Sequence, residues 1–312
     1  MKTIVVGLCI QGNKRRKVAA DDVVAAVEPT DNTACYKAVQ DVPLDSFDSA
    51  LVCTPDNVKY EILEYLLYNR KHVLVEKPLL TDDENSLQRL RKLAADNGVT
   101  CYTAYNHRFE PHIERVKSYL DEGSLGQIYS LRCFYGNGTA RDVRNSAWRD
   151  TGMGVLSDIG SHLLDMLIYL LGDAIPNLVP LNCQCIENRA FDYISFGSAV
   201  GSIPRIQLEA SLLSWRNTFD LDIIAESGSL HVSCLCKWGP STFTVRERVL
   251  PSGRPTEHIE RLECADPTWD LEYQHFKQLC QTGANNLEND IWINSTLNNI
   301  FQEAQACKAQ SC

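Results

Sequence analysis

The first hundred residues alternate short apolar runs with segments of helical character. The apolar runs, which we expect to form strands, are Ile4–Leu8, Val23–Val27, Ser49–Cys53, His72–Val75 and Val99–Ala104. The segments predicted to form helices are Asn13–Ala20, Tyr60–Tyr68 and Asp83–Asn97. Strands that alternate with helices in this way predict an α/β domain with a doubly wound parallel sheet and right-handed crossovers.

After Tyr105 the pattern changes. A helix is predicted over Pro111–Glu122 and a strand over Gln127–Tyr135, and a polar loop is expected from there to Thr151. Strand candidates separated by turn residues follow, and the clearest are Leu208–Leu213, Phe219–Ala225 and Ser229–Cys234. Closing helices are predicted over Trp269–Cys280 and Ile291–Cys307. We therefore expect this half to be α+β with a largely antiparallel sheet.

A polar stripe lies within the apolar stretch Gly152–Asp165. Asp158, His162 and Asp165 are spaced at i, i+4 and i+7, so a helix places them on one face. An imidazole between two carboxylates on an apolar helix is costly to bury without partners or a purpose. Two interpretations stay open from these residues alone. The stripe is either functional, or it is a capped helix start with a half-buried, satisfied histidine.

A glycine-containing turn follows the first predicted strand. A dinucleotide-binding fingerprint reads G-x-G-x-x-G at such a place, and here Cys9 replaces the middle glycine. The candidate cofactor-binding residues of the turn are Gly7, Cys9, Ile10, Gln11 and Gly12. The amino end of the following helix can offer unpaired N–H groups to a phosphate.

Glu28 ends the second predicted strand, about twenty residues after the glycine turn. An acid at this place can accept a hydrogen bond from a ribose 2′-hydroxyl and repels a 2′-phosphate, which favours NAD over NADP. The basic run from Lys14 to Lys17 offers a counter-argument, because it can neutralise an additional phosphate. Its alternative interpretation is a solvated helix face.

Composition narrows the classes of function. The formal net charge of −10 argues against nucleic acid or an anionic membrane as the main partner. A strand begins almost directly after Met1, so no signal peptide is expected, and no apolar run has the ~18 residues of a spanning helix. The 13 cysteines are interpreted as reduced, buried thiols of a cytoplasmic protein, and no metal site is expected.

Four stretches together resemble one family over nearly the full length. They are the glycine turn with Glu28, Cys53-Thr-Pro-Asp56, Val75-Glu-Lys-Pro-Leu79 and Gly152–Asp165. In order and spacing they resemble the glucose–fructose oxidoreductase / inositol dehydrogenase / rhizopine-catabolism family (Gfo/Idh/MocA). Members are mostly NAD(P)-dependent oxidoreductases that act on sugars, polyols or sugar nucleotides.

The resemblance implies an architecture. Residues 1–105 would form a Rossmann NAD(P)-binding domain, and residues 106–312 a substrate and oligomerisation domain with a large, open, mostly antiparallel sheet. The closing helices can pack back on the first domain. Homodimers and homotetramers are common in the family. NAD is the expected cofactor, with NADP the lesser alternative.

The resemblance also implies roles for individual residues. Lys77, Asp158 and His162 would form the catalytic trio, and the Lys77–Pro78 bond is expected to be cis. The residues expected along the cofactor cleft, beside the glycine turn and Lys77, are Thr54, Pro55, Asp56 and Glu76. The chain departs from the family pattern at Cys9, at Lys59, where many members have histidine, and in the short segment between the second and third strands. That segment predicts a missing or reduced helix.

These residues suggest a mechanism for oxidising a secondary alcohol. His162 has an intrinsic pKa near neutrality and is the natural base for the hydroxyl proton. Lys77, as ammonium, can stabilise developing alkoxide charge. Asp158 can orient these two or bind substrate. Asp165 can fix the tautomer of His162 or bind a sugar hydroxyl.

A basic and aromatic cluster suggests the substrate. Arg141, Arg144, Trp148 and Arg149 precede the predicted helix, and Asn106 and Arg108 follow the last Rossmann strand. Arginine forks with an aromatic side chain suit the diphosphate and base of a sugar nucleotide. The alternative is a surface loop whose arginines pair with Asp142 and Asp150.

Two other functions stay open. One is a non-catalytic NAD-binding sensor or regulator of the same fold, which Cys9 favours and the complete trio disfavours. The other is an NADP-dependent reductase of a non-sugar carbonyl.

Overall fold

The computed structural model describes residues 1–81, 83–146 and 148–310 of the 312-residue chain. The chain folds into two compact units. Unit 1 comprises Met1–Asn106 and Thr268–Ser295, and unit 2 comprises His107–Pro267 and Thr296–Cys312. The segment Thr268–Ser295, which lies within the range 106–312 predicted for the second domain, belongs to the unit with the amino terminus.

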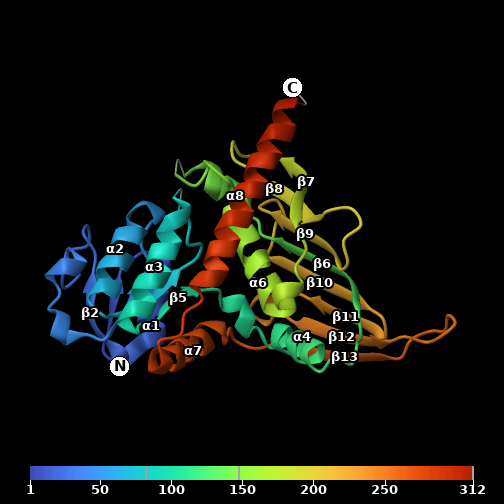
Figure 1. Cartoon of the computed structure of the whole chain (residues 1–312), viewed down its shortest axis with the longest axis horizontal. Helices are drawn as coiled ribbons and strands as arrows, with labels where there is room; N and C mark the ends of the chain where they lie inside the picture. Colours follow the sequence, from blue (N-terminus) through green and yellow to red (C-terminus); the bar gives the residue numbers. More distant parts are fainter. Residues whose placement is uncertain (82, 147, 311–312) are drawn as a thin grey trace. The chain divides into compact units, whose positions relative to one another are not determined.

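Unit 1 is built on a parallel sheet of five strands in the order β2-β1-β3-β4-β5, which confirms the predicted fold (Figure 1). The strands are β1 (Thr3–Val6), β2 (Val23–Val27), β3 (Ser49–Val52), β4 (His72–Glu76) and β5 (Cys101–Ala104). The helices are α1 (Ile10–Ala19), α2 (Asp56–Tyr68), α3 (Glu84–Asn97), α7 (Thr268–Thr282) and the start of α8 (Leu287–Gln310).

Both faces of this sheet are buried, as expected of a parallel sheet. Ile4 and Val6 of β1 pack in one apolar cluster with the leucines of α2 and α3, which lie side by side in Figure 1. Val5 points to the opposite face and packs with Tyr273 and Phe276 of α7. Helix α7, which follows Pro267 in the sequence, therefore completes the core of the first sheet.

The connection between β2 and β3 contains no α-helix. Two short 3₁₀ turns, Val39–Asp41 and Leu44–Ser46, take its place. This agrees with the reduced helix expected from the shortness of the segment. β2 pairs with one edge of β1, and β3 pairs with the other. The order in which successive strands are added to the sheet therefore reverses between β1 and β3.

The basic run of α1 does not form a uniformly solvated face. Arg15 is 1% exposed, and its guanidinium pairs with Glu76 at 2.7 Å and with Glu272 of α7 at 2.6 Å. Burial alone would lower the pKa of Arg15, but the two carboxylates raise it above its ordinary value. The interpretation as a solvated face is therefore wrong for Arg15, which is a buried structural cation.

Unit 2 is built on an eight-stranded sheet in the order β13-β12-β11-β10-β6-β9-β8-β7. The strands are β6 (Ile128–Gly136), β7 (Leu178–Gln184), β8 (Tyr193–Ser198), β9 (Arg205–Ser211), β10 (Thr218–Ala225), β11 (Gly228–Ser233), β12 (Ser241–Glu247) and β13 (Glu257–Leu262). The helices are α4 (Pro111–Asp121), α5 (Ala140–Arg144), α6 (Ser161–Leu171) and the end of α8. Only the β6–β9 pair is parallel among the described strands of this sheet.

Burial in unit 2 follows the period of two that a one-sided sheet requires. In β10, Phe219, Leu221 and Ile223 are buried, whereas Asp220 and Asp222 between them are half-buried. Helix α4 packs against β11 and β12, and α4 also contacts α6, so both helices cover the apolar face (Figure 1). The predicted antiparallel α+β architecture is confirmed.

One local expectation was wrong: the region Gly136–Thr151, expected to be a polar loop throughout, contains helix α5. The helix expected to carry the polar stripe is present, and a π-helical turn, Leu156–Gly160, leads into α6 at Ser161. Among the described cysteines, Cys53 and Cys133 are buried as expected, but Cys9 and Cys35 are exposed.

No helix within the described part of the chain combines the length and the hydropathy that crossing a bilayer requires.

Candidate active site

The candidate cofactor residues of unit 1 lie at the carboxyl edge of its sheet. Gly7 follows β1, Glu28 follows β2, Thr54 follows β3 and Lys77 follows β4. Ligands of open α/β sheets bind outside this edge, where the connections diverge to opposite sides. In unit 1 the divergence falls between β1 and β3. The sequence motifs thus converge where the topology predicts a ligand crevice.

The glycine turn is closely packed. A Cβ on Gly12 would lie 1.8 Å from the carbonyl oxygen of Gly7, and a Cβ on Gly7 would lie 2.7 Å from that of Cys53. Cys9 meets the same neighbour, because its thiol donates to the Cys53 carbonyl at 3.3 Å. The thiol is therefore directed to the end of β3. Through this contact the side chain of Cys9 is accommodated at the middle position of the motif.

Glu28 is tied to the glycine turn. Its Oε2 accepts a hydrogen bond from the Leu8 amide at 3.0 Å, and its Oε1 accepts from the amide and hydroxyl of Thr30. The Leu8 amide is the main cause that holds the pKa of this carboxyl below its ordinary value. Glu28 is therefore an anion at neutral pH, fixed beside the turn.

Three features of this edge fit a bound dinucleotide. The amides of Ile10, Gln11 and Gly12 form the first turn of α1, where no intrahelical acceptor is available to them. The buried Oγ1 of Thr54 has no hydrogen-bond partner among the described residues. The anionic Glu28 suits a ribose hydroxyl. In contrast, the carboxylate of Glu76 is engaged by Arg15.

Lys59 holds the turn that carries Lys77. Its side chain is 4% exposed, and its ammonium group donates to the carboxylate of Asp56 at 2.5 Å and to the carbonyls of Glu76 at 2.9 Å and Pro78 at 3.0 Å. The last two carbonyls flank Lys77 on both sides. The Lys77–Pro78 bond is cis, as expected. Lys59, which stands where many family members have histidine, therefore holds the backbone on both sides of Lys77.

In unit 2, a close backbone contact starts the helix that carries the polar stripe. Gly154 has φ +55°, and a Cβ there would lie 2.3 Å from the carbonyl oxygen of Phe191. Val155 donates its amide to the same carbonyl at 2.8 Å. The π turn follows directly. Such turns are frequent at functional sites.

The three polar residues of the stripe differ in exposure. The side chain of Asp158 is 43% exposed and lies 3.9 Å from Arg149. His162 is 9% exposed, and Asp165 is 1% exposed. The exposed fraction of these side chains therefore falls along the helix. Asp158 and His162 are the two that a ligand can contact.

Asp165 is paired with Arg108. The guanidinium donates to both carboxylate oxygens, from Nε at 2.7 Å and from Nη2 at 2.5 Å. Burial raises the pKa of Asp165, and Arg108 opposes this rise. Both residues were predicted to bind substrate, but the structure engages each with the other. We now propose a structural role for the pair.

Aromatic rings that no local sequence pattern indicates lie beside His162. The imidazole of His107 stacks on it with a centroid distance of 4.3 Å, and Tyr135 of β6 lies 6.1 Å away. Trp238 contacts Tyr135 at 5.4 Å. Burial raises the pKa of Tyr135, and Asp158 adds to this rise, so its phenol stays neutral at physiological pH. The sequence signal for His107 was its place between Asn106 and Arg108, both of which were noted.

The arginines Arg141 and Arg144, which lie in helix α5, remain at the surface. Arg141 is 85% exposed and lies 3.9 Å from Glu187, and Trp148 is 77% exposed. Asp150, expected as a possible partner, instead accepts from the amides of Arg189 and Ala190. Arg144 is exposed as well. Asn106 is buried, and its Nδ2 donates to Thr268 at 2.7 Å, so its side chain already has a structural partner.

Lys77 belongs to unit 1, whereas Asp158 and His162 belong to unit 2. Their assembly into one trio therefore stays a prediction.

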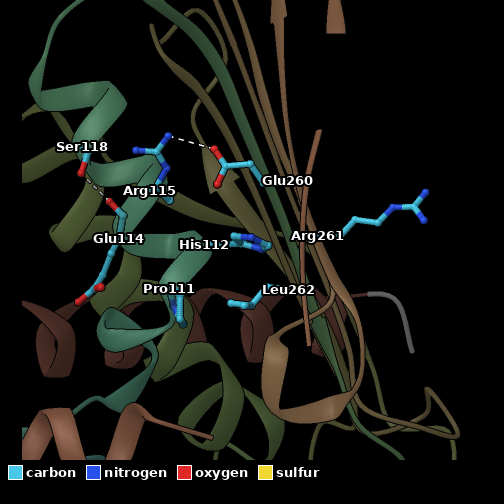
Figure 2. Close-up of a pocket in the computed structure, with 8 residues that line it drawn as sticks. All are labelled: Pro111, His112, Glu114, Arg115, Ser118, Glu260, Arg261 and Leu262. Atoms are coloured by element: carbon cyan, nitrogen blue, oxygen red, sulfur yellow. Dashed lines mark hydrogen bonds and ion pairs between the residues drawn. The ribbon is translucent and has the colours of Figure 1, made fainter. Parts of the chain in front are cut away.

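A separate hollow in unit 2 contains none of the predicted site residues. Figure 2 shows it between α4 and β13, with His112 directed toward the sheet and Arg115 paired with Glu260 at 3.0 Å. Its lining carries both signs of charge. Arg261 extends away from the hollow in this view. We therefore assign it no part in the candidate site.

Comparison with known proteins identifies relatives of the chain. Levoglucosan dehydrogenase of Pseudarthrobacter phenanthrenivorans is 32% identical over 127 residues, which cover 39% of this chain and 32% of that protein. An NADP(+)-dependent scyllo-inositol 2-dehydrogenase of Bacillus subtilis is 27% identical over 173 residues, covering 54% and 47%. The matched segments thus span about a third to a half of these curated relatives.

A solved structure of levoglucosan dehydrogenase with NADH and L-sorbose superposes with a TM-score of 0.84 at 16% identity. The superposition covers 98% of this chain and 97% of that one. At this identity the likeness shows the fold.

Two family models match consecutive parts of the chain. The model described as an oxidoreductase family with an NAD-binding Rossmann fold matches residues 2–105. The model of the GFO/IDH/MocA C-terminal domain matches residues 113–231. Together they match well over half of the sequence, in the order that the four motifs require. The chain belongs to the Gfo/Idh/MocA oxidoreductase family.

Proposed function

We propose that the chain is an NAD-dependent dehydrogenase that oxidises a secondary hydroxyl of a sugar or polyol. The observation that carries the proposal is the buried imidazole of His162, with Asp158 one turn before it in the family's second domain. The glycine turn and Glu28 in the family's NAD-binding domain support it. The relatives named above, dehydrogenases of levoglucosan and of an inositol, support the substrate class.

Each residue has a separate role in the proposed reaction. His162 accepts the hydroxyl proton, because neutral imidazole is a base near pH 7. Lys77 donates a hydrogen bond to the substrate oxygen and stabilises the charge that develops there. Asp158 binds a neighbouring hydroxyl, and the neutral phenol of Tyr135 can do the same. Ile10, Gln11, Gly12, Thr54 and Glu28 would hold NAD, which supplies the hydride acceptor.

The test is incubation of the protein with NAD and a panel of sugars, polyols and sugar nucleotides, while the absorbance of reduced nicotinamide is followed. Turnover with at least one neutral sugar or polyol is expected. Tight NAD binding without turnover on any member of the panel would contradict the proposal and favour a sensor. Assembly into a homodimer or homotetramer and a cytoplasmic location also stay predictions.

Glu28 is expected to set the preference for NAD. Glu28→Gln keeps an oxygen that can accept from the Leu8 amide but removes the negative charge. A hydrogen bond to a charged group contributes about 1.5–3 kcal/mol, so the ratio of kcat/KM for NAD over NADP should fall roughly 10- to 100-fold. Glu28→Ala also removes the acceptor of the Leu8 amide and serves as comparison. A wild-type protein that already prefers NADP would show this assignment to be wrong.

The arginines of the segment before α6, two of them exposed on α5 and the third, Arg149, half-buried, support a finer proposal, an anionic substrate such as a sugar nucleotide. Replacing Arg141, Arg144 and Arg149 together by alanine should then raise KM for a sugar nucleotide about tenfold or more, because charge-assisted bonds to a diphosphate are lost. KM for a neutral sugar is the internal control and should change little. An equal KM for the sugar nucleotide in both proteins would return these arginines to an ordinary surface role.

A further inference from the structure

The ring of His107 lies against the ring of His162. The two centroids are 4.3 Å apart and the planes differ by 19°, which is a nearly parallel stack. Both residues belong to unit 2, and both are largely buried, at 3% and 9% exposure. At this distance the ring of His107 covers one face of the His162 ring and blocks its rotation toward that side. The remaining freedom of the imidazole is set by what surrounds the pair.

Two larger aromatic rings pack beside the stack. Tyr135 lies 5.3 Å from His107 and 6.1 Å from His162. Trp238 meets His107 edge-on at 6.2 Å and packs on Tyr135 at 5.4 Å. The rings come from β6, from the 3₁₀ turn Cys236–Trp238 and from the turn Asn106–Phe109. Rings from three separate segments thus pack together here, and those of His107 and Tyr135 contact the ring of His162.

The segment that carries His107 is anchored on both sides of the stack. The next residue, Arg108, binds both carboxylate oxygens of Asp165, which follows His162 by three positions on α6. Glu110, fully buried, accepts a hydrogen bond from the amide of Cys236, two residues before Trp238. These anchors fix the His107 ring relative to α6 and to Trp238, so the stack does not depend on ring contact alone.

We propose that His107 is a positioning residue that holds the imidazole of His162 in the orientation needed to accept the substrate proton. A small displacement of a reacting group can lower the rate as much as a hundredfold. A residue that keeps the base in place therefore contributes to the rate. The inference rests on the proposed function and adds to it the residue that orients its base.

Two substitutions of His107 test the stack. His107→Ala removes the supporting face, and His107→Phe restores an aromatic face without ring nitrogens. We expect kcat to fall roughly 10- to 100-fold in His107→Ala, with KM for NAD unchanged, and to recover to within a few-fold of wild type in His107→Phe. His107→Ala with wild-type kcat, or His107→Phe as impaired as His107→Ala, would overturn the positioning role.

His112 provides a matched control in the same unit. It is equally buried, at 3%, its ring lies 6.0 Å from that of Phe243, and its Nδ1 bonds the hydroxyl of Ser241 at 2.9 Å. His112→Ala should therefore lower thermal stability about as much as His107→Ala while leaving kcat unchanged. An equal loss of kcat in both variants would show that the effect is general loosening of unit 2, and would contradict the inference.

A measurement that needs no turnover separates this inference from the proposed function. Nuclear magnetic resonance relaxation of the ring C–H groups, in protein labelled with ¹³C-histidine, reports the mobility of the His162 ring. A rigid ring is expected in the wild type and in His107→Phe, and a mobile ring in His107→Ala. An equally rigid ring in all three proteins would overturn the positioning role. A protein with this pattern but no dehydrogenase turnover would refute the proposed function alone.

Discussion

Lys77→Ala is expected to lower turnover with NAD and the preferred sugar or polyol by about 10²- to 10³-fold, the usual effect of removing one donor to a developing oxyanion. Affinity for NAD should stay nearly unchanged. The reason lies in Lys59, which binds the carbonyls of Glu76 and Pro78 on either side of Lys77. The backbone of the turn is therefore held without the side chain that is removed. Initial rates and a fluorescence titration with NAD measure the two quantities.

A matched control lies at the opposite end of the same strand. Lys71 directly precedes β4, and its ammonium also binds backbone carbonyls, those of Leu44 and Phe47. Lys71→Ala removes a comparable lysine at the amino edge of the sheet, so it should leave kcat unchanged. A Lys77→Ala protein that retains more than about a tenth of wild-type kcat would refute the role of Lys77.

Arg108→Met is expected to reduce the free energy of unfolding by about 3–5 kcal/mol at pH 8, because it leaves the carboxylate of Asp165 buried without its partner. The loss should be smaller at pH 5. The folded-state pKa of Asp165 is raised above its unfolded value, burial being the main cause and Arg108 opposing it. A group of this kind stabilises the fold most below its unfolded pKa, about 3.9, and this contribution is lost as pH rises through the folded pKa.

Removing Arg108 raises the pKa of Asp165 further, so the loss grows and extends to higher pH. Urea unfolding at pH 5 and pH 8 measures the difference. The double variant Arg108→Met, Asp165→Asn should recover most of the stability and lose the pH dependence. Arg115→Met breaks a surface pair with Glu260, each side chain about half exposed, and should cost at most about 1 kcal/mol. Equal losses in Arg108→Met at both pH values would contradict a buried Asp165 anion.

Local sequence patterns were sufficient to predict the architecture and the candidate cofactor residues at the carboxyl edge of the sheet in unit 1. The apolar runs that predicted β1 to β5 form those strands, because a strand buried on both faces needs an uninterrupted apolar sequence. Glycine spacing located the turn where a Cβ on Gly12 would meet Gly7. These features depend on neighbours within a few residues, so a sequence can carry them.

Features that depend on distant partners were missed. Arg15 resembled a solvated residue until Glu272, more than 250 positions later, supplied its buried partner. His107 lies 55 positions before His162, and no periodicity relates them. Helix α5 is five residues long, too short to display an amphipathic period. Lys59 was noted as a departure from the family, but its function follows only from the carbonyls that the fold brings to it.

The central claim is that a hydride leaves a carbinol carbon of the substrate for the nicotinamide ring. The direct measurement uses the sugar or polyol identified by the panel, carrying deuterium at its ring C–H positions, with mass spectrometry of the reduced cofactor. We predict one deuterium in each molecule of reduced cofactor, a slower turnover than with the undeuterated substrate, and loss of the label with His162→Ala or Lys77→Ala. Reduced cofactor without deuterium, or tight NAD binding with no reduction at all, would contradict the account.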